Sequence, residues 1–415
     1  DSHTFSIANS GTASVVVANF GQDSSFAGAK TAGGNADGNG IGDFFYAPPS
    51  GFLTLCTKNL PDATVTPSKH FNTVLYTANA GTNVITGVGF QPDFSWFKIR
   101  NSSGSPALFD VIRGVNSGLA SNQAAAEYIA ASDKDLVSFD SDGFTLGAGE
   151  DWASVNQTNG SSIVAWNWKA GTSASGATNG AGGSNKTYTA SYNADAGFSI
   201  VNYVGNAAGG HTIPHHLGAI AEMIIVKNRN ASEDWRVYHH LLGQSVANDA
   251  HKWLALNSTA AATDSYDSWW DVEPTSSVFS VGNGNATNKD GDNHIAYCFR
   301  SIDGYSKVGT YVGNGNADGV FVHTGFAVQW VMIKRTDSAN YWLVLDDTRR
   351  EYNPNFTSLY PNLSNAEDNF GNGTGIDFLS NGFKHRDNVA STNASGGTYI
   401  YIAFASVPSK FANAR

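Results

Sequence analysis

Short runs of alternating apolar and polar residues, separated by Gly, Asn and Asp, recur along the whole chain. The run GFQPDFSWFKIR, from Gly89 to Arg100, is representative. In an extended backbone Phe94, Trp96 and Lys98 lie on one face and Phe97 lies on the other. TYIYIAF and SFDSDGFTLG show the same alternation. Runs of this length that are rich in β-branched and aromatic residues predict β-strands.

The strand that ends in lysine occurs three times. The second and third examples are AEMIIVKNR at 221–229 and VQWVMIKR at 328–335. Each is followed by an apolar strand, a segment rich in Leu, Asn and Ala, a strand with Gly, and a closing aromatic strand. The spacing to the closing strand is 67 residues from Lys98 to Ala165, and 69 residues from both Lys227 to Ala296 and Lys334 to Ala403. A repeat of about 100 residues is more typical of a domain than of a small solenoid unit.

This pattern predicts an all-β chain of tandem β-sandwich domains of the jelly-roll or concanavalin-like type. A three-bladed propeller is the competing architecture. The only helix-like piece is residues 121–135. Residues 170–187 are rich in Gly, Ser, Ala and Asn, which is typical of a flexible linker. The predicted parts are the C-terminal end of another β domain at 1–70, a first sandwich at 71–170, a linker at 171–187, a second sandwich at 188–304 and a third at 305–415.

Composition narrows the classes of function. Charged residues make up 14% of the 415 residues, below the roughly 25% of an average globular protein, so the surface is predicted to be mostly neutral and polar. The net charge is −11 and no basic block occurs, which argues against nucleic-acid binding. No apolar run approaches the roughly 18 residues of a membrane span. The two cysteines, Cys56 and Cys298, are either buried free thiols or a disulfide, so the redox compartment stays open.

The order of the motifs GFQPDFSWFKIR, LFDVIRG, LASNQAAAE, FDSDGFTLG and IVAWNWKAG resembles a repeat found in structural proteins of tailed bacteriophages, especially marine ones. The preceding NFGQDSSFAG and NGIGDFFYAPPSGFLTLC resemble the end of a SPRY-like, concanavalin-type sandwich. Together these stretches cover nearly the whole chain. The resemblance implies a virion protein of a tail fibre, a head fibre or a surface decoration, and it implies no catalytic residue.

The recurring lysine has two interpretations. It belongs either to a ligand-binding ridge or to the end of a strand, where its alkyl stem covers aromatic surface. In two copies an acid and an arginine follow on the next strand, whereas the second copy differs there. These residues are Asp110 with Arg113, Asp346 with Arg349, and His239 with Leu242. A lysine that is kept while its partners change favours the scaffold role.

Acidic turns supply candidate calcium ligands. Calcium takes several oxygen ligands, and loops rich in Asp and Asn can provide them. No turn matches the full EF-hand loop, and Asp–Gly and Asn–Gly are also the commonest hairpin turns, so both interpretations stay open. The candidate ligands are Asp37, Asn39 and Asp43, then Asp140 and Asp142, then Asp290 and Asp292. Histidines at 211, 215, 216, 239 and 240 lack nearby cysteines and alternate in direction, which argues against structural zinc.

The stretch YDSWWDVEP, residues 266–274, holds the candidate ligand-binding residues Trp269, Trp270 and Asp271. An aromatic face with polar groups at its rim suits a sugar, although the same residues also suit packing against a neighbouring domain or subunit. A glycan-cleaving enzyme would need two acids flanking the bond, and the candidates beside aromatics are Glu150 and Asp151, and Asp267, Asp271 and Glu273, although nearly every β protein has such pairs. No phosphate loop, nucleophile elbow or metalloprotease motif occurs in the sequence.

We therefore expect a non-enzymatic virion structural protein at the particle surface. Its expected partners are further copies of itself, as a trimer of the kind that fibres often form, other virion proteins and a host surface polysaccharide. No cofactor is expected apart from the calcium that the acidic turns could bind. A secreted multidomain carbohydrate-binding protein is the alternative, and a glycan depolymerase is a third reading. Neither nucleic acid nor membrane insertion is expected.

Overall fold

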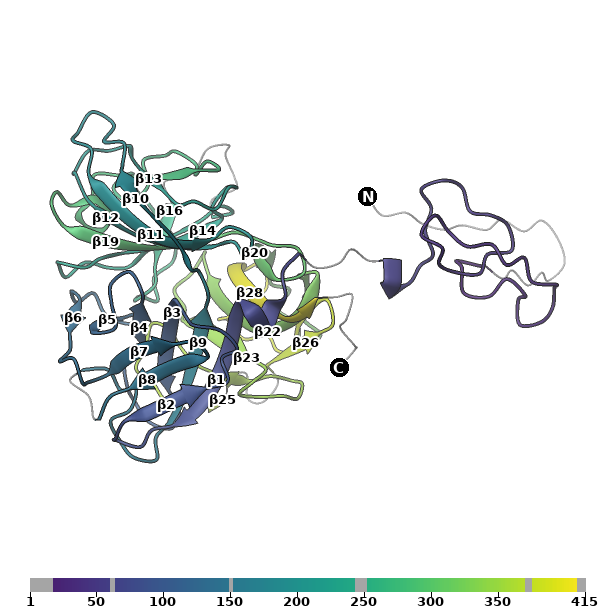
Figure 1. Cartoon of the computed structure of the whole chain (residues 1–415), viewed down its shortest axis with the longest axis horizontal. Helices are drawn as coiled ribbons and strands as arrows, with labels where there is room; N and C mark the ends of the chain where they lie inside the picture. The colour runs from purple at the N-terminus through teal and green to yellow at the C-terminus, as the bar shows by residue number, and fades with distance from the viewer. Residues whose placement is uncertain (1–17, 60–63, 149–151, 243–251, 370–374, 409–415) are drawn as a thin grey trace. The chain divides into compact units, whose positions relative to one another are not determined.

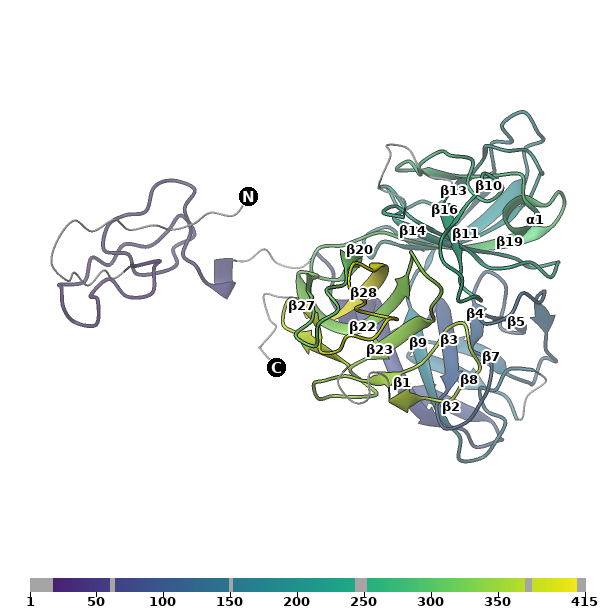
Figure 2. The same ribbon diagram turned by 180° about the vertical axis from the view of Figure 1, so that it is seen from behind.

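A computed structural model of the chain describes residues 18–59, 64–148, 152–242, 252–369 and 375–408. The chain divides into two compact units, Asp1–Asp62 and Ala63–Arg415, and each is described by itself. In the larger unit three main antiparallel sheets gather round one centre, as Figure 1 and Figure 2 show from opposite sides.

The smaller unit is held together mainly by polar contacts. Its described residues, 18–59, contain the 3-10 turn η1 (Thr57–Asn59) and an antiparallel bridge between Asn35 and Phe44, but no strand. The side chains buried there are polar. The 3-10 turn η2 (Pro67–Lys69), which was expected to close this part, instead contacts β1 and β28 of the larger unit.

Each main sheet pairs its strands in the same order: a first strand, the closing aromatic strand, the strand that ends in lysine, and the strand after it. The first sheet runs β1 (Phe71–Thr77), β9 (Ser162–Trp168), β3 (Phe94–Ile99), β4 (Ala107–Asp110), β5 (Ser117–Ala120), β6 (Tyr128–Ile129). The second runs β10 (Thr172–Ala177), β11 (Thr187–Asn193), β12 (Phe198–Val204), β19 (Asn293–Phe299), β14 (Met223–Asn228), β15 (Arg236–His239), β16 (Lys252–Ala255), β17 (Thr263–Asp264). The third runs β20 (Ser306–Val312), β28 (Thr398–Pro408), β22 (Phe326–Arg335), β23 (Trp342–Asp346).

A small sheet covers one face of each main sheet. Behind the first lie β2 (Asn83–Thr86), β8 (Gly143–Leu146) and β7 (Leu136–Asp140); behind the second, β13 (His211–Pro214) and β18 (Val278–Val281); behind the third, β21 (Phe321–His323), β27 (Gly382–His385) and β26 (Ile376–Leu379). The remaining elements are α1 (Asn285–Asn288) and the pair β24 (Thr357–Ser358) and β25 (Asp368–Asn369). Each small sheet shares an apolar core with its own main sheet, so the predicted all-β sandwich fold is confirmed.

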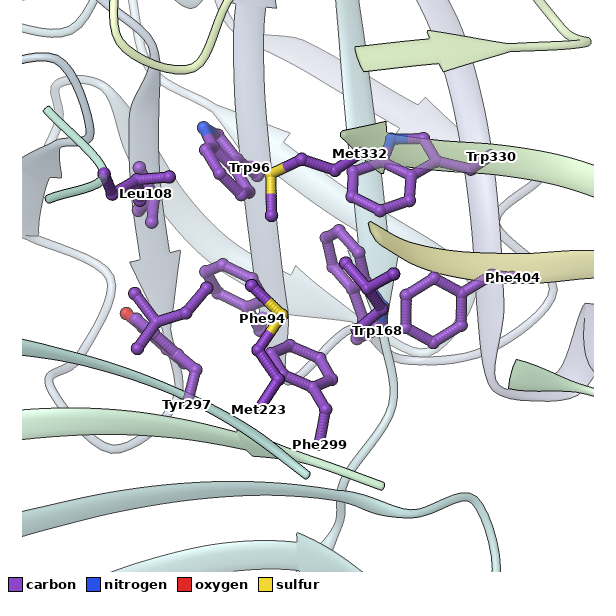
Figure 3. Close-up of a pocket in the computed structure, with 13 residues that line it drawn as sticks. Phe94, Trp96, Leu108, Trp168, Met223, Tyr297, Phe299, Trp330, Met332 and Phe404 are labelled. Carbon is purple, nitrogen blue, oxygen red and sulfur yellow. The ribbon is translucent and has the colours of Figure 1, made fainter. Parts of the chain in front are cut away.

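The other face of every main sheet contributes to one central aromatic core. The ring of Trp168 in the first sheet lies 6.5 Å from that of Phe299 in the second and 5.7 Å from that of Trp330 in the third, measured between centroids. Phe94 stacks on Tyr297 of the second sheet at 4.4 Å. Figure 3 shows these rings converging from several strands. The void among them is about 10 Å³, too small to hold more than one water molecule, so this is packed interior rather than a ligand site.

The two faces of β3 are divided as the alternation predicts. Phe94 and Trp96 belong to the central core, whereas Phe97 and Ile99 belong to the core shared with the small sheet. All six residues of β3 are buried, because both faces of the sheet are covered. This double burial explains why the strands that end in lysine are apolar on both sides.

Three details differ from the sequence-based expectations. Residues 171–187 contain β10, which pairs along its length with β11 and is therefore not a featureless linker. Residues 121–135 form no helix. The N–H of Glu127 donates to the main-chain oxygen of Arg229, and the hydroxyl of Ser121 donates to the main-chain oxygen of Pro361, so both residues bond outside the segment. The third closing strand is offset by two residues: Lys334 lies opposite Ile400, which makes Tyr401 the counterpart of Ala165.

Candidate functional site

The recurring lysine, on strands β3, β14 and β22, is buried in every main sheet. Lys98, Lys227 and Lys334 are each 1% exposed or less. Lys98 Nζ donates to the main-chain oxygens of Gly104 at 2.6 Å and Ser364 at 2.9 Å. Burial lowers the pKa of each lysine to about 8. The ammonium groups therefore donate to main-chain carbonyls inside the protein. They form no exposed ridge, and they do not extend into solvent as a strand-end lysine would.

Two of these lysines link neighbouring sheets. Ser364 belongs to the third sheet's part of the chain, so Lys98 joins the first and third sheets. Lys334 Nζ donates to its neighbour Arg335 at 2.6 Å and to Thr259 of the second sheet's part at 3.3 Å. Lys227 Nζ bonds within its own part, to Asn228 at 2.6 Å and Ala231 at 3.2 Å.

A buried ion network joins the first and second sheets. Arg113 Nε donates to Asp110 Oδ2 at 2.5 Å, and both side chains are fully buried. The same guanidinium reaches Glu127 Oε1 at 3.1 Å, and Glu127 in turn pairs with Arg229 at 2.6 Å. The hydroxyl of Tyr297, from the second sheet, donates to Asp110 at 2.7 Å. Every member has a charged or hydrogen-bonding partner, as a buried network requires.

A matching network joins the third and first sheets. Arg349 pairs with Asp346 at 2.6 Å and with Glu367 at 3.0 Å, and Arg100 pairs with Glu367 at 2.9 Å. The indole N–H of Trp166, from the first sheet, donates to Asp346 at 3.0 Å. Burial alone would raise the pKa of Glu367, but its two arginine partners outweigh burial and hold that pKa below its usual value.

At the junction of the second and third sheets, the four positions that hold the Asp, two Arg and Glu side chains in the other junctions carry different residues. His239 and Leu242 stand where the other junctions have Asp and Arg. Ala262 stands where the other junctions have Glu127 or Glu367. Its N–H donates to the main-chain oxygen of Thr336, just as the N–H of each glutamate donates to the main-chain oxygen of its arginine partner. Thr336 therefore replaces that arginine. Burial, reinforced by the neighbouring His240, lowers the pKa of His239 to about 3, so it is neutral at pH 7.

A groove of about 710 Å³ opens at this junction. Leu242, Ala262 and Thr336 line it, so it occupies the region that arginine and glutamate side chains fill in the other two junctions. Its size is within the range of about 300–1,000 Å³ that is usual for small-ligand pockets. The rest of the lining combines aliphatic side chains, hydroxyl groups, one ammonium and one carboxylate: Leu241, Lys252, Ala261, Thr310, Tyr311, Val312, Asp337, Thr398, Tyr399 and Ile400.

Trp269 and Trp270 are divided between interior and surface. Trp269 is 2% exposed and packs edge-on against Tyr238, with the ring centroids 5.7 Å apart. The prediction that Trp269 is an exposed ligand-binding residue is therefore wrong, because the second sandwich core takes up its ring. Trp270 is 42% exposed and lies over Gly209 and Gly210; a Cβ on Gly209 would come within 2.3 Å of the indole.

The loop after Trp270 is shaped by a left-handed residue. Asp271 has a φ of 48° and is half-buried, and its N–H donates to the oxygen of Trp269 at 2.6 Å. Tyr266 and Val272 of the same loop are 57% and 44% exposed. Trp270, Tyr266 and Val272 are thus the large apolar side chains of the predicted ligand-binding stretch that reach the surface.

In the smaller unit the two candidate carboxylates accept hydrogen bonds from nearby donors, and the side-chain amide of Asn39 donates to Asn59 Oδ1 at 3.0 Å. Asp37 accepts from three main-chain N–H groups, including that of Asn39, at 2.8 to 3.0 Å. Asp43 accepts from the N–H and the hydroxyl of Ser24, at 3.0 and 2.5 Å. Such contacts are typical of side chains that stabilise a turn.

The candidate ligands in the larger unit behave similarly. Asp142 accepts from the N–H groups of Gly87 and Gly89, which lower its pKa. The others accept from side chains: Asp140 from Ser138 and Thr145, Asp290 from Lys186, and Asp292 from Asn228 and Lys289. Among the described residues, no group of three or more His, Cys, Asp and Glu is placed to hold a metal ion.

The histidines have separate hydrogen-bond partners. His211 contacts Asn288 and Thr178 at 3.0 and 2.6 Å, and His216 contacts the hydroxyl of Tyr188 at 3.0 Å. His215 contacts the oxygen of Thr275 at 3.1 Å, and His239 and His240 pack ring to ring. Cys56 and Cys298 are both free thiols. Of the acid pairs, Glu150 and Asp151 lie outside the described residues, and Glu273 accepts a hydrogen bond from the hydroxyl of Tyr238.

The groove was not predicted, although part of its signal is visible in the sequence. The departures at His239 and Leu242 mark the junction that differs. Ala262 and Thr336 lie far from both in the chain, and only the fold shows that these four positions meet.

A family model described as a domain of unknown function, DUF7483, matches residues 66–408. No curated protein matches the chain, and no solved structure matches it. Within the described residues, no helix is both long and apolar enough to cross a membrane.

Proposed function

The chain belongs to the DUF7483 family, and we propose that it is a non-enzymatic structural protein at the surface of a tailed-phage particle. The observation that carries this proposal is the way in which the three main sheets are joined. They share one aromatic core, and buried ion networks link the first sheet to both of the others. Such an arrangement supports a single stiff body, which suits a building block.

Two further features support the proposal. The motifs from GFQPDFSWFKIR to IVAWNWKAG resemble the repeat of phage structural proteins. A charged fraction of only 14% gives a neutral polar surface, which suits a protein carried on the outside of a particle. In this role the protein would assemble as a homo-oligomer, with a trimer as the first expectation.

Antibody labelling of intact particles under electron microscopy tests the location. Signal at fibre tips, along a fibre or over the head supports the virion role and shows which of these structures carries the protein. If purified particles carry no label while the culture fluid contains the protein, the virion role is wrong and a secreted carbohydrate-binding protein takes its place.

A second candidate function is adhesion to a surface glycan, and the position of Trp270 favours it. The indole lies on the Gly209–Gly210 backbone with part of its surface open, so its orientation is set before any ligand binds. A flat aromatic face beside the polar groups of Asp271 suits the apolar face of a sugar ring.

Binding to a panel of neutral oligosaccharides, measured by calorimetry, tests this adhesion. Trp270→Ala should weaken binding by about tenfold or more, because the stacking face is lost. Tyr352→Ala is the matched control, since Tyr352 is 76% exposed elsewhere on the same unit. Equal affinities in both variants would exclude Trp270 as the sugar-binding residue. Release of reducing ends by the wild type would instead favour a depolymerase.

A further inference from the structure

The first strand of the third sheet, β20, has an edge that is half covered. The N–H of Ser306 donates to Ile302 and the N–H of Val308 donates to the hydroxyl of Ser301, so these residues turn their main-chain groups away from β28. Since direction alternates along a strand, Thr310 and Val312 turn theirs outward as well. No described residue bonds to those outward groups of Thr310 and Val312, and both residues border the groove.

The second sheet shows what such an edge accepts. In that sheet β12 is the counterpart of β20, because β12 pairs with the closing strand β19 as β20 pairs with the closing strand β28. The outer side of β12 is paired with β11 along Tyr188–Asn193. In the third sheet only a short turn, residues 300–305, precedes β20, and no strand among the described residues pairs with that edge. Within the part of the chain that the structure describes, the same kind of edge is therefore occupied in one sheet and open in the other.

The larger unit also carries an unprotected strand, β10. Its sequence, TSASGA, contains no charge and no proline, and five of its six residues are exposed. The N–H of Thr178 bonds to Lys186 within the hairpin, so alternation places the main-chain groups of Ser173, Ser175 and Ala177 outward, where no described residue bonds to them. Natural edge strands usually carry a lysine, a proline or a bulge that prevents pairing, and β10 has no such residue.

We propose that β10 of one copy of this chain adds to the open edge of β20 in a second copy, beside the groove at the junction of the second and third sheets. The small side chains of β10 suit a narrow space between sheets, and the groove gives the incoming strand room alongside Thr310 and Val312. Main-chain hydrogen bonds would supply the affinity, as in other cases of strand addition.

This contact joins two different surfaces, so it is head-to-tail. Repetition of a head-to-tail contact gives a ring if the rotation closes, and a filament if it does not. A ring of three would be the trimer expected for a fibre. The inference rests on the proposed function, because it names the surfaces through which neighbouring copies of a particle protein would meet.

Sedimentation of the full chain over a range of concentrations tests the contact. We expect concentration-dependent association of the wild type. Ser175→Pro removes an outward N–H without touching the β10–β11 ladder, and it should raise the dissociation constant at least about tenfold. Ser175→Lys, which places a charge on the same edge, should have the same effect and serves if the proline variant fails to fold. Association of both variants at wild-type strength would overturn the inference, as would a wild type that stays monomeric.

Disulfide trapping tests the identity of the two edges. In a Cys56→Ser background, a Ser175→Cys chain mixed with a Thr310→Cys or a Val312→Cys chain should form a crosslinked dimer under mild oxidation, because facing residues of paired strands lie about 4.5–5.5 Å apart. Leu75→Cys, on β1, is the matched control, since Leu75 is 39% exposed on the corresponding edge strand of the first sheet. Equal crosslinking of Ser175→Cys with Leu75→Cys would show that β20 is not the specific partner.

Particle labelling separates the two proposals. Labelled particles combined with a monomeric purified protein would overturn the strand contact and leave the virion role intact. Association through β10 and β20 in a protein that particles lack would do the reverse.

Discussion

Each buried lysine ammonium exchanges its hydration shell for two main-chain carbonyl oxygens. At Lys98 these oxygens belong to Gly104 and to Ser364, so one side chain satisfies acceptors from two parts of the fold. Burial of a charge favours its neutral form, which is why the pKa of Lys98 falls to about 8. The sequence shows the recurrence of this lysine, but the apolar residues around it predict a strand end equally well whether the ammonium is buried or exposed.

The lowered pKa makes a prediction about stability and pH. Between about pH 8 and the unfolded value near 10.4, the unfolded state holds more protons at Lys98 than the folded state, so this residue's contribution to the free energy of unfolding rises with pH. The difference between wild type and Lys98→Met should therefore grow in favour of the wild type by about 1–2 kcal/mol from pH 8 to pH 9.5. Urea unfolding at four pH values in this window measures it.

Lys69→Met is the control for that experiment. Lys69 is exposed at the end of η2, so Lys69→Met removes one lysine charge without emptying a buried site. A Lys98→Met difference that changes no more with pH than that of Lys69→Met would mean that the ammonium of Lys98 is hydrated in the folded protein.

At the scale of elements, hydrophobic alternation predicts the strands and the face of each residue, but it does not fix register. A shift by two residues leaves every side chain on its own face, and TYIYIAFAS is apolar on both faces. The closing strand of the third sheet was accordingly predicted two residues out of place, with Ala403 where the structure has Tyr401. Residues 121–135 are the one helix-like piece of the sequence, but tertiary hydrogen bonds from Ser121 and Glu127 accompany a non-helical backbone there.

The ion network between the first and second sheets is expected to be essential to their junction. Arg113→Met keeps the apolar stem but leaves the carboxylates of Asp110 and Glu127 buried with less compensation. Removal of one partner from a buried pair typically costs about 3–5 kcal/mol, and we expect a loss of that size in the free energy of unfolding. Denaturant unfolding by tryptophan fluorescence measures it, and Arg349→Met tests the matching junction.

Arg386→Met is the surface control for this prediction. Its side chain is 41% exposed where it pairs with Asp377, so its removal should cost no more than about 1 kcal/mol. Similar losses in Arg113→Met and Arg386→Met would indicate that the buried network adds little beyond an ordinary surface pair.

At the scale of the whole molecule, the sequence predicts the kind of fold but not how its parts meet. Alternation shows that the strands ending in lysine are apolar on both faces, yet nothing local says which face meets a small sheet and which meets a neighbouring main sheet. Trp168 illustrates this limit, since its partners Phe299 and Trp330 lie far away in the sequence. The groove has the same origin: changes at Leu242 and Ala262 form one site only after the sheets have come together.

A shared core has a consequence for unfolding. If each sandwich were independent, calorimetry would resolve separate transitions, and a mutation in one outer core would lower only one of them. Because the three main sheets bury their second faces against one another, we expect residues 63–415 to unfold in a single transition. Trp168→Ala in the central core and Phe144→Ala in the first outer core should each shift that single transition to lower temperature and reduce the free energy of unfolding by about 3–5 kcal/mol.

The two substitutions together decide between a stiff body and a string of domains. A separate low-temperature transition in Phe144→Ala, with the remainder unchanged, would mean that the first sandwich folds on its own and that the central core is only a contact surface. A common shift would mean that no sheet retains its fold once its second face is exposed. Deletion of the third sheet should then leave the first two unfolded, because the rings of Trp168 and Phe299 would lose the cover that Trp330 and Phe404 provide.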